Sequence, residues 1–509
     1  MHNEKALSEL DILIRARYPL ISIISVEEQR VLEYLRHISA KLGKKLYVWT
    51  AATGLQKDTS VIPSHYQKTV KIAELIQSLE KIAQDNEPAL YFFKDLEYYL
   101  EEPIILRILK ELHCILRHSY KNLLFISHEY KNRPAIESFI ALYDFPYPTR
   151  QAIRKNYYEL VDQVNQRKFK VCREDDFVEK LTDAALGLTE DEFENVISRV
   201  LVKYQGIAPE HLSDIYSEKK QIIRKSGVLD YYESRVGMRE IGGLGALKSW
   251  LQKRKKAFSQ KAREFGVPLP KGILLLGVQG CGKSLSAKAV ANFFDFPLLK
   301  LDMGRLFSSY IGSSEENIRK AIHLANTLAP VVLWIDELDK ALSGLQSSGM
   351  SDSGTTARVA ATLLTWLQEK EEAVFVVATA NDIEKLPPEL FRRGRFDEIF
   401  FVDLPDREER KEIFSIHLEK RQRDPRKYDL VSFVQLSDGL SGAEIEQCII
   451  NALYEAFDEE KQLNDNHIKH AIRECYPLSQ MMEFKVQALR SWAQKRALSA
   501  SGYTKKEQQ

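Results

Sequence analysis

The sequence predicts an α/β protein built from two similar halves, in each of which an αβ region precedes a helical region. Three observations support this fold class. Apolar strand-like runs alternate with amphipathic helical patterns in residues 1–150 and again in 233–408. Charged helical patterns without strand signals follow in 151–232 and 409–480. Short segments of the first half also recur in the second half in the same order, which indicates an internal duplication.

Length and composition limit the number of domains, the class of partner and the compartment that this protein can have. The 509 residues leave room for three or four domains, and 73 Lys and Arg balance 72 Asp and Glu, so net charge favours neither nucleic acid nor a membrane as partner. The five cysteines form no C-x-x-C pair, which argues against a zinc site or disulfide framework and suits a reducing compartment. No signal-like segment opens the chain and no apolar run approaches the roughly 20 residues that span a bilayer, so we expect no transmembrane segment.

Residues 1–150 are expected to form an αβ domain without a phosphate loop. Helical patterns such as 28–41 lie between its apolar strand-like runs. Repeated βα units favour a mostly parallel sheet with helices on both faces. Residues 151–232 are then expected to be a helical, lid-like region and linker. The expected strands are 19–25, 46–49, 89–93 and 123–126.

The duplication rests on three pairs of matching segments, and the alternative is two unrelated αβ-plus-helix domains. The differences between the halves are also informative. Where the second half has a glycine loop, the first has Ser-Val-Glu-Glu at 25–28, and two carboxylates there would repel phosphate. Lys94 stands where the second half has Asp336. We therefore expect the first half not to bind nucleotide and to be a scaffold for partners or subunit contacts. The matching segments are 88–96 with 330–338, 144–146 with 403–405, and 187–194 with 439–446.

The αβ region 233–408 contains a phosphate-binding loop. An apolar run, 273–276, leads into G-V-Q-G-C-G-K-S, and a helix-prone run follows, which is the context that G-x-x-x-x-G-K-[ST] requires. Its glycines allow backbone N–H groups to surround phosphate oxygens, and the helix N-terminus adds partial positive charge. Lys283 is placed for the β- and γ-phosphates and Ser284 for Mg²⁺, whereas a glycine turn without a ligand is the alternative. The predicted nucleotide-binding residues here are Gly277, Val278, Gln279, Gly280, Cys281, Gly282, Lys283, Ser284 and Leu285.

Polar residues end two further buried strands of the same region. Asp336 and Glu337 follow an apolar run, so both carboxylates are expected at the carboxyl edge of the sheet, beside the phosphate loop. Asp336 would hold Mg²⁺, largely through water, and Glu337 would orient the attacking water. Asn381 ends the next strand, where its amide could contact both this water and the γ-phosphate, or could simply cap a turn.

Three segments admit two interpretations each. Arg392, Arg393 and Arg395 are either a solvated surface or a source of positive charge for the γ-phosphate of a neighbouring subunit. Tyr310 and Ile311, beside a glycine, are either buried or part of an exposed loop that grips a chain. The basic run 253–256 favours a solvated helix face over nucleic-acid contact, because no aromatic residues interleave with it.

The end of the chain is expected to be helical. Residues 409–480 carry the helical patterns of a lid that follows the αβ region. Residues 481–509 are expected to be a C-terminal helix and a disordered tail, the tail beginning at Ser499 because the remaining residues are mostly polar.

These motifs make the second half, about residues 235–480, resemble the AAA family of ATPases. Residues 277–284 resemble the family's Walker A motif and 334–337 its Walker B motif, and Asn381 resembles sensor 1. The resemblance implies a degenerate RecA/AAA-like αβ half with a helical lid, followed by an active AAA module with a parallel five-stranded sheet and its own lid. Further matches are the adenine-side segment with Ile241 and Gly242, the pore loop with Tyr310 and Ile311, the arginine fingers Arg392 and Arg395, and the lid segment with Gly442 and Ala443.

Four positions depart from the usual family pattern. Val278 and Gln279 replace Pro-Pro in the phosphate loop, Glu240 replaces Asp, and Ser313 replaces an acidic residue after the pore-loop glycine. The whole chain resembles the AAA proteins of cyanobacteria and algal plastids, a family that also has bacterial members. The resemblance therefore implies either bacterial cytoplasm or the plastid (chloroplast) stroma.

The resemblance implies an ATP hydrolase that needs ATP and Mg²⁺. It also implies a ring, usually a homo-hexamer, that couples hydrolysis to remodelling of a protein partner. Catalysis would rest on Lys283, Glu337, Asn381, Arg392 and Arg395. An ATP-controlled switch or assembly scaffold that threads no substrate is the alternative, and a nucleic-acid motor is less favoured by the balanced charge.

Overall fold

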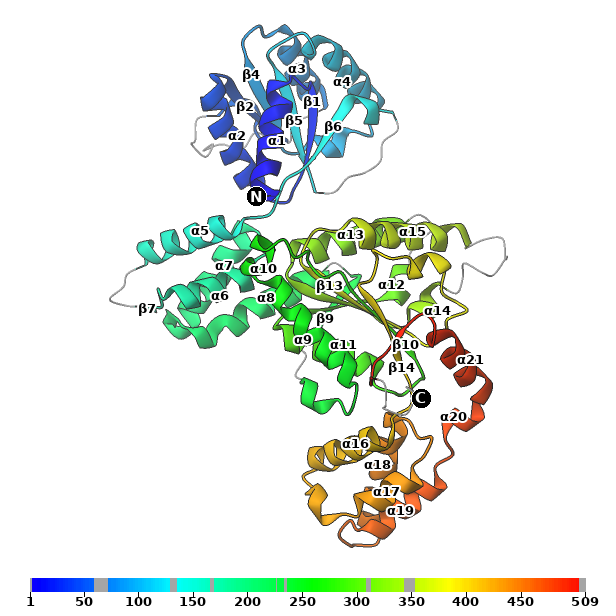
Figure 1. Ribbon diagram of the computed structural model, residues 1–509. Coiled ribbons are helices and arrows are strands. Elements are labelled where there is room, and N and C mark those ends of the chain that lie inside the picture. Colours follow the sequence, from blue (N-terminus) through cyan, green and yellow to red (C-terminus); the bar gives the residue numbers. More distant parts are fainter. Residues whose placement is uncertain are drawn as a thin grey trace. The chain divides into compact units, whose positions relative to one another are not determined.

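The chain divides into two compact units, Met1–Tyr216 and Ser217–Gln509, each of which is described by itself. The computed structural model describes residues 2–58, 72–128, 135–164, 169–225, 227–232, 236–307, 313–342 and 353–502 (Figure 1). Among these residues, none of the helices combines the length and the apolar character that crossing a membrane requires. The domain boundaries expected at 150, 232, 408 and 480 remain predictions.

The first unit holds a six-stranded sheet in the order β3-β2-β4-β5-β1-β6, parallel except for the β2–β3 pair. Every residue of the two central strands, β4 and β5, is buried, as a parallel sheet covered on both faces requires. Alternate side chains of β4 enter different cores: Tyr91 and Phe93 pack with α3 and α4, and Leu90 and Phe92 with α1 and α2. The elements are α1 (His2–Arg15), β1 (Leu20–Ile24), α2 (Glu28–Leu42), β2 (Lys45–Thr50), β3 (Gly54–Lys57), α3 (Ile72–Gln84), β4 (Ala89–Phe93), α4 (Pro103–Leu116), β5 (Asn122–Ser127) and β6 (Ile140–Asp144).

Helices follow this sheet, as the sequence predicts. The helix α7 begins with a capping box, in which the Thr189 side chain accepts from the N–H of Glu192 and the Glu192 side chain accepts from the N–H of Thr189. Two short strands pair beside these helices. The elements are α5 (Arg150–Gln163), β7 (Lys170–Val171), α6 (Asp175–Ala185), α7 (Glu190–Tyr204), β8 (Gly206–Ile207) and α8 (Leu212–Lys225), and the second unit begins within α8, at Ser217.

The second unit is organised around a seven-stranded sheet in the order β15-β14-β10-β13-β12-β11-β9. Its five central strands are parallel, as expected, and two edge strands extend them: β9 is antiparallel to β11, and β15 is parallel to β14. Leu274 and Leu276 of β10 face the core under α13 and α15, whereas Ile273 and Leu275 face the core under α9 and α11. The elements are β9 (Leu229–Tyr232), α9 (Gly245–Lys255), α10 (Gln260–Glu264), β10 (Gly272–Gly277), α11 (Lys283–Phe294), β11 (Leu298–Leu301), α12 (Met303–Phe307), α13 (Ser313–Thr327), β12 (Val331–Ile335), α14 (Leu338–Leu342), α15 (Ser353–Glu369), β13 (Val374–Ala380) and β14 (Glu398–Val402).

A helical lid with its own core completes the second unit. Phe414, Phe433 and Ile449 lie at the centre of this core, and none of the three is exposed. The first helix of the lid, α16, is capped by Asp406, and α18 is capped by Ser441. The elements are α16 (Arg407–Lys420), α17 (Leu430–Leu436), α18 (Gly442–Asp458), α19 (Asp465–Glu474), α20 (Leu478–Met481), α21 (Glu483–Ala493) and β15 (Leu498–Ser499).

The two units share one strand order, which supports the duplication. Numbered along the chain, the five parallel strands of each sheet run 5-1-4-3-2, namely β6-β1-β5-β4-β2 and β14-β10-β13-β12-β11. The helix after each matching lid segment also starts with the same capping box, formed by Thr189 and Glu192 in α7 and by Ser441 and Glu444 in α18. Two unrelated domains would not be expected to share both features.

The prediction that a disordered tail begins at Ser499 is wrong for residues 499–502. Ser499 belongs to β15, which pairs with Phe401 of β14. The next residue, Ala500, is fully buried, donates its N–H to the Phe401 carbonyl and accepts from the N–H of Leu247. These backbone hydrogen bonds order a segment whose side chains alone give no strand signal, and residues 503–509 lie outside the described part of the chain.

Candidate functional site

The glycine-rich loop lies at the carboxyl end of β10, between that strand and the start of α11. All six residues of β10 are buried, and the strand is hydrogen-bonded to β13 on one side and β14 on the other. Gly280 and Gly282 have φ angles of 80° and 86°, a conformation that glycine adopts without a steric penalty. Because α11 begins at Lys283, its first N–H groups and positive dipole end face the space above the loop.

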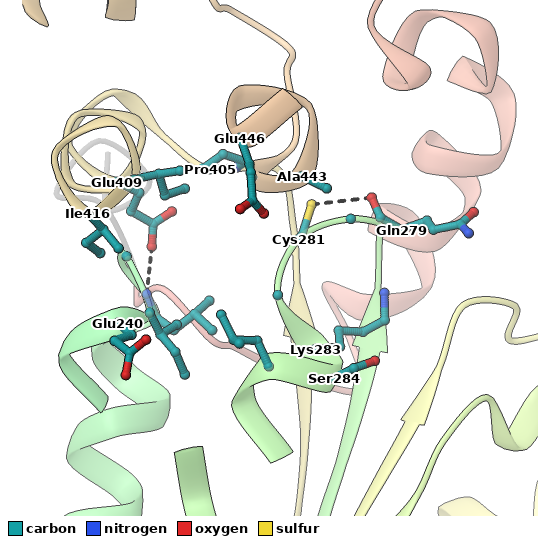
Figure 2. A pocket seen from close by; sticks show the side chains of 18 of the residues that line it. Glu240, Gln279, Cys281, Lys283, Ser284, Pro405, Glu409, Ile416, Ala443 and Glu446 are labelled. Carbon is teal, nitrogen blue, oxygen red and sulfur yellow. Dashed lines mark hydrogen bonds between the residues drawn. The ribbon is translucent and has the colours of Figure 1, made fainter. Parts of the chain in front are cut away.

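A cavity of about 410 Å³ lies over this loop, between the αβ part of the second unit and its lid (Figure 2). Most of the residues predicted to bind nucleotide line it. The predicted residues in the lining are Ile241, Gly242, Gln279, Gly280, Cys281, Gly282, Lys283, Ser284, Leu285, Asp336, Glu337, Asn381, Gly442 and Ala443.

The ammonium group of Lys283 is held inside the loop. Its Nζ donates to the carbonyl of Gly277 at 2.9 Å and to that of Val278 at 2.7 Å, and the side chain is almost fully buried. Burial lowers the pKa of Lys283 to about 8, because the charged form is deprived of water. A phosphate group in the cavity would favour the charged form. Gly277 and Val278 therefore orient the lysine, although neither lines the cavity.

Asp336 lies beside the phosphate loop, as predicted, and contacts Ser284 at the end of this loop. The Ser284 hydroxyl donates to Oδ1 of Asp336 at 3.0 Å, and the Thr379 hydroxyl donates to the same oxygen at 2.6 Å. A hydroxyl and a carboxylate at this distance, beside a phosphate-binding loop, are the hard oxygen ligands that Mg²⁺ prefers. The residues present therefore fit a magnesium ion. Thr379 was not predicted, although it lies on the strand that ends near Asn381.

Glu337 adopts a backbone conformation that is uncommon for a residue with a side chain. Its φ is 49°, and its N–H donates to the Thr379 hydroxyl at 3.0 Å. Its carboxylate lines the cavity and pairs with Lys340 at 2.7 Å, an ion pair that is open to solvent. The left-handed turn ends β12, so that Asp336 and Glu337 project into the same cavity from consecutive positions.

Asn381 lies at the end of β13 and lines the cavity with its neighbours. Its N–H donates to Oδ1 of Asp339 at 3.3 Å, and burial raises the pKa of Asp339. This contact ties the end of β13 to α14, the helix that follows Glu337. The two chain segments that carry Asn381 and Glu337 are therefore held together.

The lid is joined to the αβ part by hydrogen bonds to backbone groups on the αβ side. Ala443, in the first turn of α18, donates its N–H to the carbonyl of Gly280 at 3.0 Å. From α16, Glu409 accepts from the N–H of Leu244 at 2.9 Å, the contact drawn in Figure 2. Glu412 accepts from the N–H of Gly243 at 2.7 Å. Lid and αβ part are thus joined on both sides of the cavity.

The end of the cavity farther from Ser284 combines apolar and charged residues. Ile241 and Ile413 offer apolar surface of the kind that a planar base contacts. His417 pairs with Glu446 at 3.3 Å, and burial lowers the pKa of His417. Lys420 pairs with Glu240 at 3.2 Å, which links α16 to the segment before α9.

Apart from Gly442 and Ala443, the lid residues of this lining were not found from the sequence. They lie more than 120 positions after the phosphate loop, and no motif marks them. The apolar and charged positions of α16 repeat at helical spacing, which was the only available signal. The lining residues that sequence reasoning missed are Leu244, Thr379, Asp403, Pro405, Glu409, Ile413, Ile416, His417, Lys420 and Glu446.

Two predicted groups are not brought to this cavity within one chain. Arg392 is exposed, Arg395 donates to the carbonyl of Glu389, and neither lines the cavity. The predicted pore-loop residues Tyr310 and Ile311 lie outside the described residues. The structure of one chain therefore leaves the roles of these four residues as predictions.

The corresponding place in the first unit is occupied by the unit's own side chains. Lys94 follows β4 as Asp336 follows β12, and it pairs with Glu28 at 3.2 Å. Glu27, at the position of the glycine loop, is 6% exposed, pairs with Arg30 and accepts from the N–H of Glu190 at 2.8 Å. Glu190 is the first residue of α7. A carboxylate of the first unit thus contacts the start of its own helix α7.

Comparison with protein families gives three matches, which together cover most of the chain. The model of the ATPase family associated with various cellular activities (AAA) matches residues 273–404. Residues 6–145 match the N-terminal domain of SpoVK-like AAA ATPases, and 151–226 match the second domain of the same group. The expected AAA module is confirmed.

Several curated proteins are similar over nearly the whole chain. The AAA domain-containing protein ycf46 of Trieres chinensis is 40% identical over 95% of this chain and 96% of its own length. The ycf46 protein of Pyropia yezoensis is 40% identical over 95% of this chain and 97% of its own length. The proteasome-activating nucleotidase of Aeropyrum pernix is 35% identical over 38% of this chain and 48% of its own length.

Proposed function

Because the chain belongs to the family of ycf46 AAA domain-containing proteins and is an ATP hydrolase, we propose that it couples Mg²⁺-dependent ATP hydrolysis to remodelling of a protein partner. In this proposal the chain acts as an oligomeric ring, a homo-hexamer. The bacterial cytoplasm or plastid stroma is its proposed compartment, in keeping with five free cysteines. The expected boundaries at 150, 232, 408 and 480 separate its proposed domains.

The observation that carries the proposal is the convergence of one cation and three carboxylate or hydroxyl groups at a single cavity. Lys283 and Ser284 begin α11, Asp336 and Glu337 follow β12, and all four line the cavity between the αβ part and the lid. Phosphoryl transfer depends mostly on positioning and charge stabilisation, and this set offers both. A ligand without phosphate would offer no anionic group to the loop N–H groups and the Lys283 ammonium group.

Each residue has a proposed role. The loop N–H groups and Lys283 bind the phosphates, and Ser284 and Asp336 hold Mg²⁺, which supplies charge stabilisation to the phosphates when bound. Glu337 orients the attacking water and accepts its proton. Asn381 fixes this water from the neighbouring strand end. Ile241, Gly242, Gly442 and Ala443 contact the nucleoside side of ATP.

Arg392 and Arg395 are proposed to act on the γ-phosphate of a neighbouring subunit. Arg392 is exposed and Arg395 is partly exposed, and neither reaches the cavity of its own chain. An arginine that acts between subunits must reach the site of the next copy. Arg392 and Arg395 lie away from the cavity of their own chain, which favours a role in the site of a neighbouring subunit.

The decisive experiment replaces the proposed water-orienting carboxylate. Glu337→Gln should keep ATP binding and lose turnover by about a thousandfold, because the amide cannot accept the proton of the attacking water. Glu371→Gln, at an exposed position after α15, is the matched control and should turn over ATP normally. ATP binding is measured by calorimetry and turnover by phosphate release. Unchanged turnover in Glu337→Gln would sink this mechanism.

A second candidate function is an ATP-controlled switch or assembly scaffold that threads no substrate. It is favoured by the first unit, where Glu27 pairs with Arg30 and Glu28 pairs with Lys94 at the positions that match the phosphate loop and Asp336. Such pairing is expected of a unit that serves contacts rather than catalysis. Tyr310→Ala distinguishes the two functions. Loss of partner remodelling with normal ATP turnover favours threading, and unchanged remodelling favours the switch. Partners that remain bound to Glu337→Gln would identify the substrate.

A further inference from the structure

Lys300 is a charged residue on β11, the strand beside the edge strand β9, and neither motif nor family match assigns its role. It lies on β11 directly opposite Trp334 of β12. Its ammonium group is 3.7 Å from Oδ2 of Asp336 and 4.6 Å from the centre of the Trp334 ring. Its side chain is 29% exposed, so the charge is partly withdrawn from water. Lys300 does not line the nucleotide cavity.

The contacts of Asp336 explain why this lysine matters. Oδ1 of Asp336 accepts from Ser284 and Thr379, whereas Oδ2 faces Lys300. Both carboxylate oxygens are thus engaged by groups of the chain itself. A magnesium ion held through Asp336 has to share this carboxylate with an ammonium group 3.7 Å from Oδ2, and two cations on one carboxylate repel each other.

We propose that Lys300 is a positioning residue that keeps Asp336 in place before Mg²⁺ arrives and sets the Mg²⁺ concentration that nucleotide binding requires. This inference rests on the proposed magnesium site. The ion pair neutralises Asp336 when no metal is bound, so the carboxylate stays at Ser284 without a metal. The same pair weakens the attraction of Asp336 for the metal. With Lys300 in place, the site therefore needs a higher Mg²⁺ concentration for half-saturation than it would need without this ion pair.

Trp334 supports a fixed position for this ammonium group. Two ammonium groups lie over the Trp334 ring: Nζ of Lys300 is 4.6 Å from the ring centre and Nζ of Lys288 is 5.6 Å from it. Ammonium groups are attracted to the face of an indole ring, and this attraction adds to the pull of Asp336. Lys288 makes the ring contact from α11, whereas Lys300 makes both the ring contact and the ion pair with Asp336. Lys288 therefore offers a matched control.

The test measures how much Mg²⁺ the protein needs to bind a fluorescent ADP analogue, followed by anisotropy. Lys300→Met should lower the half-saturating Mg²⁺ concentration about fivefold, which corresponds to about 1 kcal/mol, the upper end for partly exposed ion pairs. Lys300→Gln, which keeps a polar group, should lower the half-saturating Mg²⁺ concentration in the same way. It replaces Lys300→Met if the methionine variant folds poorly. Lys300→Arg and Lys288→Met should both match the unchanged protein.

The outcomes separate this inference from the proposed function. If Lys300→Met and Lys300→Gln bind the ADP analogue normally and need as much Mg²⁺ as the unchanged protein, or more, the role of Lys300 is overturned and the magnesium site stands. An equal shift in Lys288→Met would also overturn it, because ring packing rather than the ion pair would then be responsible. If Mg²⁺ does not affect binding in the unchanged protein, the magnesium site itself fails.

Discussion

Glu27 joins the αβ part of the first unit to the helix α7, and its replacement tests whether a buried carboxylate holds them together. The Glu27→Ala change leaves the guanidinium of Arg30 and the N–H of Glu190 without this partner. Removing one member of a buried ion pair costs about 3–5 kcal/mol. Arg30 keeps its hydrogen bond to the carbonyl of Pro146, so we expect the lower end, about 3 kcal/mol.

Glu27→Gln should cost much less than Glu27→Ala. Burial raises the pKa of Glu27, and this effect exceeds the opposing effects of Arg30 and of the N–H of Glu190. The surroundings therefore disfavour the negative charge on balance. A glutamine of the same shape keeps an oxygen for the N–H of Glu190, so the expected loss is about 1 kcal/mol.

The raised pKa also fixes the sign of a pH effect. Arg30 faces Glu27 from α2, and Glu190 and Asp191 face it from α7. Tyr147 also lies close enough to interact with Glu27. The folded unit keeps a proton on Glu27 at pH values where the unfolded chain, with a pKa near 4.5, has lost it. Stability from this group is therefore present below pH 4.5 and is lost as the pH rises through the raised pKa. Glu27→Gln should lack this pH dependence.

Hydrogen exchange of the full chain, followed by mass spectrometry, measures these effects locally. In peptides covering the start of α7, Glu27→Ala should speed exchange about a hundredfold, which corresponds to about 3 kcal/mol, and Glu27→Gln about fivefold. Glu33→Ala, exposed on the same helix as Arg30, is the control and should exchange at the normal rate. Equal acceleration in the alanine and glutamine variants would refute the reasoning, because the charge would then matter more than the hydrogen bond.

Three further predictions concern the second unit. Gly277→Ala places a Cβ 1.9 Å from the carbonyl oxygen of Val402, so the protein should lose at least about 2 kcal/mol of stability, and an unchanged unfolding temperature would contradict this. Glu409→Ala removes the acceptor for the N–H of Leu244 beside the cavity, so calorimetry should show ADP binding weakened about fivefold, and equal affinity would mean that the lid contact is unimportant. Ala500→Asp buries a carboxylate where the side chain is fully enclosed, so the protein should unfold at a markedly lower temperature. A normal unfolding curve would show that residues near 500 do not pack on the sheet.

The sequence by itself determined the local chemistry of the second unit. A phosphate loop, a strand that ends in two acids and a strand that ends in Asn381 are each contiguous, and parallel strands place their carboxyl ends at one edge. The same reasoning showed that the first unit has no phosphate-loop sequence at the matching residues, 25–28. These inferences hold because each depends on a few neighbouring residues and on the geometry that all parallel sheets share.

Only the tertiary structure decided which distant side chains complete each site. Glu409 and His417 reach the cavity because the lid folds back over the loop, and Lys300 reaches Asp336 because β11 lies beside β12. Glu27 meets the N–H of Glu190 across 163 positions of chain. A pairing of this kind leaves no periodic trace in the sequence, because it is selected by the packing of whole elements and by the cost of leaving a buried charge without a partner.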